Sequence, residues 1–221
     1  MFTDAARRIV AMTIPVAVPL TMAAVFACLR RWCAPKTAYN IGFAVYWGGW
    51  CLAVPVAVLG PRAAVRLLTG GRRPSIPEMA ILAVPLAGAI GTELMPNRDR
   101  VDRTTAAVMV GSGLINAVGE ELLWRGLFMR SPDRADKDGV PLEAIWSLLG
   151  FAVWHLAPQL ILPSSLGPGR FVAGSALVGG VSTIVALQSD GLRYVAVAHI
   201  LTDACGVTAA RFRLGKEPVP T

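Results

Sequence analysis

The chain has 221 residues, of which 54% are hydrophobic and 16% are charged. Its mean hydropathy of +0.56 excludes an ordinary soluble domain, because a globule of this size cannot bury so much apolar surface. The net charge of +7 does not indicate nucleic-acid binding, since the basic residues are scattered over every loop between the apolar segments. These features place the protein in the multi-span membrane class.

The apolar residues form long uninterrupted blocks. They indicate transmembrane helices, because only a helix satisfies its backbone hydrogen bonds within one segment. Pro85, Gly88 and Gly91 interrupt the third block, so that span is expected to be kinked, tilted or short. The sequence predicts an all-α, polytopic transmembrane helix bundle of about seven spans (six to eight), at 9–29, 39–59, 79–94, 104–129, 142–157, 171–187 and 192–210.

The polar segments divide the chain into three parts. Residues 1–103 are expected to form N-terminal membrane helices with about three spans, and 104–210 a second helix bundle. A short basic tail follows at 211–221. We expect loops at 61–77, which is basic, and at 131–141, which is charged and rich in turn residues. The Lys and Arg residues of the loops divide equally, ten to each side, so the positive-inside rule predicts no orientation.

Several ionisable residues lie inside the predicted spans. A charge at the bilayer centre costs roughly 2.5–3.5 kcal/mol on insertion scales, so such residues usually face the bundle interior and serve function. Glu121 and Arg125 are four residues apart and are expected to form an ion pair. His199 and Asp203 have the same spacing, which allows Asp203 to fix the tautomer of the ring. The full set is Glu120, Glu121, Arg125, His155, His199 and Asp203, with Asn116 one turn before Glu120.

These polar residues share one depth in the membrane. From the side that holds loop 131–141, the helical rise places Glu120 roughly 14 Å deep and His155 roughly 20 Å deep. The same count places His199 roughly 10 Å and Asp203 roughly 17 Å deep. Separate helix-helix hydrogen bonds and a proton relay in a transporter are the competing interpretations. The concentration of both histidines and most buried charges on three helices favours a functional site.

Three short motifs occur in order on successive predicted helices. Residues 120–125 read EExxxR, residues 151–155 read FxxxH and residues 199–203 read HxxxD. This ordered set resembles the CPBP family of intramembrane proteases, which includes CAAX prenyl endopeptidases and bacterial relatives linked to bacteriocin self-immunity. The resemblance covers the second half of the chain, so that 104–210 would be the protease-like catalytic bundle.

The resemblance implies a role for each motif residue. Glu120 would be the general base that activates water together with His155. Glu121 and Arg125 would hold that helix and the carboxylate in position. His199, oriented by Asp203, would stabilise the oxyanion or help to hold the water. Phe151, one turn before His155, is expected to pack against the imidazole.

Metal dependence and turnover both stay open at this level. Zinc could be bound by Glu120, His155 and His199, with an open position for water. The absence of an HExxH motif favours a metal-free, glutamate-type endopeptidase with no cofactor. The alternatives are a small transporter that uses a Glu/His proton relay and a non-catalytic immunity or binding protein of the same fold. The expected partners are a peptide or membrane-protein substrate and the lipid bilayer, and the expected location is a bacterial plasma membrane.

Overall fold

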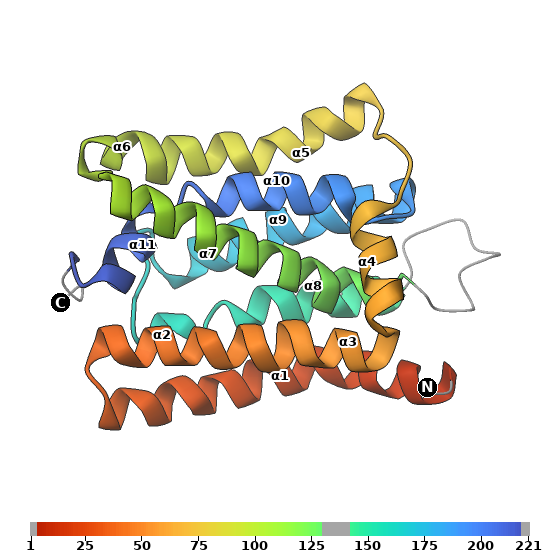
Figure 1. The fold of residues 1–221 in the computed structure, drawn as a ribbon, viewed down its shortest axis with the longest axis horizontal. Coiled ribbons are helices and arrows are strands. Elements are labelled where there is room, and N and C mark those ends of the chain that lie inside the picture. Colours follow the sequence, from red (N-terminus) through yellow and green to blue (C-terminus); the bar gives the residue numbers. More distant parts are fainter. Residues whose placement is uncertain (1–3, 130–141, 218–221) are drawn as a thin grey trace.

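The computed structural model describes residues 4–129 and 142–217, and all regular structure in these ranges is helical. The expected loop at 131–141 lies outside the described residues. Most of the helices run along a common axis, as expected for a membrane bundle (Figure 1). The main helices are α1 (Asp4–Trp32), α2 (Pro35–Val45), α3 (Val54–Leu59), α4 (Pro61–Thr69), α5 (Ile76–Ala89), α6 (Met95–Asn97), α7 (Arg103–Glu121), α8 (Leu142–Trp154), α9 (Pro168–Ser189), α10 (Arg193–Asp203) and α11 (Val207–Leu214).

Five continuous helical segments in the described ranges are long and apolar enough to cross a membrane: 6–32, 35–59, 76–100, 103–126 and 168–189. The predicted last span at 192–210 is not one straight helix, because α10 and α11 are bent by 66° at residues 204–206. If this bent pair counts as one span, the number rises to six. The all-helical, multi-pass prediction is therefore confirmed, with the last span corrected to a broken helix.

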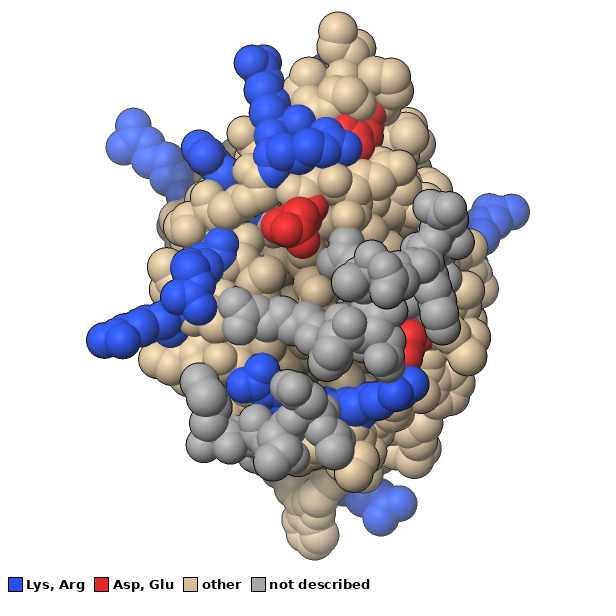
Figure 2. Space-filling model, turned by 90° about the vertical axis from the view of Figure 1, so that its right-hand side faces the viewer, with Lys and Arg blue, Asp and Glu red and all other residues tan. Residues whose placement is uncertain are grey.

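The basic segment at 61–77 is not simply a loop, as the sequence suggested. Pro61 starts α4, because a proline suits the first turn of a helix, where its missing N–H is not needed. This helix lies across one end of the bundle (Figure 1) and buries Ala63 and Ala64. Its arginines stay exposed, and Figure 2 shows that end of the molecule with basic side chains spread around its rim.

The sides of the bundle are apolar. Large hydrophobic side chains such as Leu20 and Val110 are more than half exposed, at 67% and 58%. In water this exposure would be unfavourable, whereas hydrocarbon chains solvate such surface without cost. The inside holds a cluster of aromatic rings that includes Phe26, Tyr46 and Trp154. The bundle thus exposes apolar side chains to lipid and packs its aromatic and polar residues inside.

Three π-helical stretches interrupt the spans. The first covers Tyr46–Ala53 between α2 and α3, the second Ile90–Leu94 after α5, and the third Leu122–Gly126 after α7. A π turn carries one extra residue, so it changes the direction of the side chains around it and is frequent at functional sites. Each of these stretches carries a polar side chain of the site described below.

α1 packs along α8, and Gly150 makes this approach possible. A Cβ atom at Gly150 would overlap the backbone of Pro15 in α1. We expect Gly150→Ala to lower stability by about 1–3 kcal/mol, because overpacking forces the two helices apart. Thermal unfolding in detergent measures this loss. Gly174→Ala in α9 is the matched control, because a Cβ there meets no other atom and should cost nothing. Equal melting temperatures for both variants would contradict the prediction.

Candidate functional site

Glu120 lies near the end of α7 with no exposed surface. Its Oε1 accepts a hydrogen bond from the Tyr46 hydroxyl at 2.9 Å and one from the Trp154 indole N–H at 3.0 Å. The Trp124 indole donates to the same hydroxyl at 2.9 Å, which fixes Tyr46 in turn. The second carboxylate oxygen, Oε2, has no hydrogen-bond partner among the described residues and lies 3.6 Å from Nε2 of His199. One oxygen is therefore held firmly, and the other is available.

His199 of α10 is placed between three carboxylates. Its Nδ1 lies 2.8 Å from Oε1 of Glu121, a normal hydrogen-bond distance. Its Nε2 faces Glu120 and also Asp203, whose Oδ1 is 3.5 Å away. The sequence interpretation gave the orienting role to Asp203, yet the short contact of the ring is with Glu121. Since an ionised carboxylate only accepts hydrogen bonds, Nδ1 carries a hydrogen in this contact.

Arg125 stabilises the buried Glu121. Their side chains lie 3.3 Å apart at positions i and i+4, so the predicted ion pair is confirmed. The guanidinium also stacks over the Phe151 ring, with its carbon 4.3 Å from the ring centroid. Both ionic side chains are almost completely buried, at 3% and 0% exposure. A buried charge is tolerated only when it is paired, so this arginine is what allows Glu121 to stay ionised beside His199.

Asp203 is held from the opposite direction by Asn116. The amide of Asn116 donates to Oδ2 of Asp203 at 2.8 Å, and its oxygen accepts from the Trp47 indole at 2.8 Å. The close packing of α7 on α10 makes this contact possible, because a Cβ at Gly113 would lie 3.1 Å from the backbone of Ala204. The expected participation of Asn116 is thus confirmed as a contact.

His155 comes directly after the end of α8 and lines the cavity of the site. Its Nδ1 donates to the carbonyl of Phe151 at 2.7 Å, because a carbonyl can only accept. In the neutral ring the other nitrogen, Nε2, is then left with a lone pair. The expected packing against Phe151 is confirmed by a ring distance of 4.7 Å. The Phe151 ring also lies 6.2 Å from the His199 ring, so one aromatic side chain contacts both histidines.

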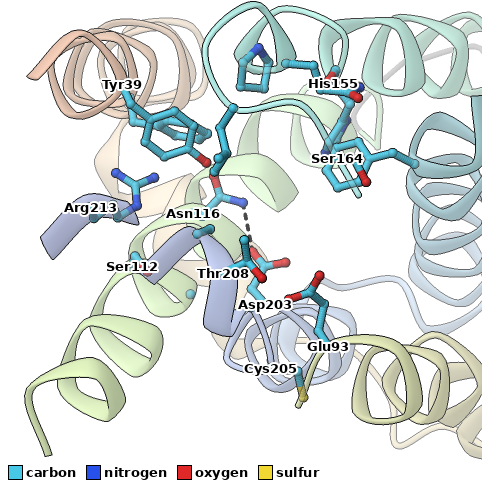
Figure 3. A pocket seen from close by; sticks show the side chains of 18 of the residues that line it. Tyr39, Glu93, Ser112, Asn116, His155, Ser164, Asp203, Cys205, Thr208 and Arg213 are labelled. Carbon is cyan, nitrogen blue, oxygen red and sulfur yellow. Dashed lines mark hydrogen bonds between the residues drawn. The ribbon is translucent and has the colours of Figure 1, made fainter. Parts of the chain in front are cut away.

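Asn116, Glu120, His155 and Asp203 line a cavity of about 270 Å³. Figure 3 shows side chains from several helices directed toward it, with the hydrogen bond between Asn116 and Asp203 on one wall. The cavity reaches the loop after α8, so Ser164 and Ser165 form part of its rim. Its polar lining consists of Tyr39, Trp47, Glu93, Ser112, Asn116, Glu120, Trp154, His155, Gln159, Ser164, Ser165, Thr202, Asp203, Thr208 and Arg213.

Zinc binding by Glu120, His155 and His199 was the alternative to a metal-free site. Zinc needs several ligand atoms within about 2.0–2.3 Å of one point. No group of three or more His, Cys, Asp and Glu side chains in the described part of the chain has the spacing to hold a metal ion. Both nitrogens of His199 already face carboxylate oxygens. Among the described residues, Glu120, His155 and His199 thus form no such group.

The structure brings Glu120, Glu121, Arg125, His199 and Asp203 into one connected group. His155 joins it through aromatic rings and the shared cavity. The sequence interpretation missed the direct partners of Glu120, which are Tyr46 and Trp154. Their only signal was that Tyr and Trp, whose buried polar tips need a partner, occur deep inside apolar spans.

Tyr46→Phe tests the contribution of the first half of the chain to the site. Phe keeps the ring that stacks on Trp154 at 3.7 Å but removes the donor to Glu120. We expect stability to change by about 1 kcal/mol or less and the rate of any Glu120-dependent reaction to fall about 10-fold, because the carboxylate is held less well. Thermal unfolding and initial rates measure the two effects. Tyr194→Phe in α10 is the control, because its hydroxyl makes no contact with the site.

Residues 102–205 match the family model described as type II CAAX prenyl endopeptidase, Rce1-like. No curated protein and no solved structure matches the chain. The matched segment begins at the N-cap of α7 and ends just after Asp203, so it contains all three motifs. It therefore confirms the resemblance to the CPBP intramembrane proteases. Over residues 102–205, just under half of its length, the chain is thus similar to the Rce1-like family of CAAX-type membrane proteases.

Proposed function

We propose that the protein is a glutamate-type intramembrane endopeptidase that hydrolyses a peptide bond near the membrane face. The observation that carries this proposal is the asymmetric environment of Glu120. Tyr46 and Trp154 hold Oε1, while Oε2 has no hydrogen-bond partner among the described residues, and Glu120 lines a cavity of about 270 Å³.

In the proposed mechanism, Oε2 of Glu120 takes a proton from water. A single water molecule can contact both Oε2 and Nε2 of His199, because these atoms are 3.6 Å apart. His155 presents its Nε2 lone pair to the same cavity and helps to hold the water. The oxygen of the water then attacks the carbonyl carbon of the peptide bond. This attack forms a C–O bond and gives a tetrahedral intermediate, whose C–N bond breaks when Glu120 returns the proton to the leaving nitrogen.

His199 is proposed to stabilise the negative oxygen of the tetrahedral intermediate through an N–H group. Such stabilisation requires a donor that is held in place before the reaction. Glu121 supplies this restraint at Nδ1, and Arg125 holds Glu121. Asp203, fixed by Asn116, lies on the Nε2 side of the ring. The side chains of Arg125, Glu121, Asp203 and Asn116 thus hold the ring of His199 from both sides.

Peptides or segments of membrane proteins, reached from the lipid bilayer, are the proposed substrates. Incubation of the reconstituted protein with a library of lipidated and unmodified peptides in H₂¹⁸O tests the proposal. Mass spectrometry should find paired fragments, with one ¹⁸O atom in the new carboxyl group of each amino-terminal fragment. A lumenal pH dye in the same vesicles tests the transporter alternative. Proton flux without any cleaved peptide would replace the protease proposal by a relay, and neither signal would favour a binding or immunity protein.

A further inference from the structure

Arg213 of α11 is an unusual cation for the wall of this cavity. Its guanidinium carbon lies 4.8, 4.3 and 4.7 Å from the ring centroids of Tyr39, Phe43 and Trp47. One of its N–H groups donates to the side-chain oxygen of Asn40 at 3.2 Å. Since a guanidinium carries five N–H donors in a fixed plane, this single bond leaves most of them available.

The neighbouring basic residues at this end of the chain are paired with carboxylates. Arg100 and Arg211 both bond Glu217, and Lys216 bonds Asp102 at 2.7 Å. Hydrogen bonds from these cations hold the pKa values of Glu217 and Asp102 below their usual range. Arg213, by contrast, has no carboxylate within salt-bridge distance among residues 4–129 and 142–217, although it lies among three apolar rings.

A charge in such surroundings favours an anionic partner. The aromatic rings stabilise the guanidinium by cation–π contact and hold its plane in one orientation. Arg213 lines the same cavity as Glu120. Figure 3 shows two further carboxylates, Glu93 and Asp203, across the cavity from Arg213. One oxygen of Glu93 is buried without a hydrogen-bond partner, so that wall repels a second anion. An anion that enters the cavity is therefore driven toward Arg213.

We propose that Arg213 binds a carboxylate of the peptide substrate and thereby sets which bond lies at Glu120. This inference rests on the proposed protease function and deepens it by naming a specificity residue. The carboxylate is either the carboxyl terminus of the peptide or an acidic side chain. Carboxylates suit this position because a guanidinium binds their two oxygens with two parallel hydrogen bonds.

The distance between Arg213 and Glu120 suits this role. Phe43 lies 4.3 Å from the guanidinium and 6.4 Å from the ring of Tyr46, whose hydroxyl bonds Glu120. Two aromatic rings, those of Phe43 and Tyr46, thus connect Arg213 to Glu120. A few extended residues of a peptide span such a separation, because each adds at most ~3.3–3.6 Å. The bound carboxylate and the cleaved bond therefore lie close together in the substrate.

The test uses peptides that the reconstituted protein cleaves, each synthesised with a free carboxyl terminus and with a terminal amide. We expect kcat/KM to be about 10- to 100-fold higher for the free acids, as for one charged hydrogen-bonded contact. Arg213→Gln should lower the value for the acid to about that for the amide, so that the ratio of the two values falls to about one. Arg213→Lys should keep part of the preference, since it retains charge but loses the planar fork.

Two controls separate this role from a structural one. Arg170→Gln removes an exposed arginine at the start of α9 and should leave the preference intact. A second set of peptides has an amidated terminus and carries either Asn or Asp at one position, which is moved along the sequence. If Arg213 binds an acidic side chain instead of the terminal carboxylate, Asp should raise kcat/KM over Asn at one of these positions. The proposal would be overturned if the wild type cleaved free acids and amides at equal rates and also cleaved the Asp and Asn peptides at equal rates. A parallel loss for acids and amides in Arg213→Gln would do the same.

A binding experiment keeps the test independent of turnover. Quenching of tryptophan fluorescence, which reports on Trp47 beside Arg213, is measured with N-acetyl-Ala-Leu-Val as free acid and as amide. The Glu120→Gln protein should bind the acid about 10- to 100-fold more tightly than the amide, and the additional change Arg213→Gln should abolish the difference. If this difference in affinity is found but the wild-type protein cleaves no peptide, carboxylate binding by Arg213 is upheld and the protease proposal fails. Equal affinities would overturn the anchor.

Discussion

Glu120→Gln should lower peptide hydrolysis by about 10²- to 10⁴-fold, the range that a lost general base typically costs. The amide of Gln has the shape of the carboxylate, and its oxygen can still accept from Tyr46 and Trp154. It cannot take a proton from water, so chemistry is lost while the hydrogen bonds around Oε1 are kept. Initial rates on a cleaved peptide, together with thermal unfolding of the same preparation, measure both sides of this expectation.

A second substitution sharpens this test. Glu120→Asp keeps an ionisable carboxylate but withdraws it by one methylene from its two donors, so we expect a partial loss of rate. Glu93→Gln is the matched control, because Glu93 lines the same cavity without contact to His199. Full proteolysis by Glu120→Gln would show that another group is the base. A rate loss of the same size in Glu93→Gln would show that general electrostatics dominates.

Arg125→Met should destabilise the protein by about 3–5 kcal/mol, because removing one partner leaves the other charge buried and uncompensated. Glu121 has no exposed surface, and its contact with Arg125 at 3.3 Å is what offsets its charge. Met has a similar length and keeps the packing on Phe151. Denaturation in detergent measures the change. The rate should also fall, because Glu121 holds Nδ1 of His199.

The double variant Glu121→Gln/Arg125→Met distinguishes a lost ion pair from lost packing. With both charges removed, we expect most of the stability to return, while activity stays low because His199 loses its carboxylate partner. Arg62→Met in α4 is the control for a simple loss of an exposed arginine and should cost little. If the double variant is as unstable as the sum of its single changes, Arg125 acts through packing rather than through its charge.

The sequence was sufficient to predict the helical class and the ionic contacts that lie within one helix. Long apolar blocks have few alternatives in a membrane, and the spacing of Glu121 and Arg125 determines their distance once a helix forms. The shared depth of Glu120 and His199 followed from the helical rise alone. These predictions needed only the residue spacing within a single helix or the helical rise per residue.

Contacts between helices were beyond such reasoning. The rotation of each span about its axis depends on packing and on the π turns, which no periodicity in the sequence reveals. Tyr46 stands at the start of one π stretch, so the direction of its side chain could not be read from a regular helix. For the same reason the ring of His199 was assigned to Asp203, its neighbour on α10, whereas the shorter contact comes from Glu121 on α7.

The 66° bend between α10 and α11 has an evolutionary consequence. His199 and Asp203 precede the bend, whereas Arg213 follows it, so the turn at 204–206 determines how far the arginine stands from the polar residues of α10. Changes in this turn would alter which peptides are accepted without altering any group that takes part in bond breaking. A lineage could therefore acquire new substrates through a few backbone positions while its hydrolytic machinery stays constant.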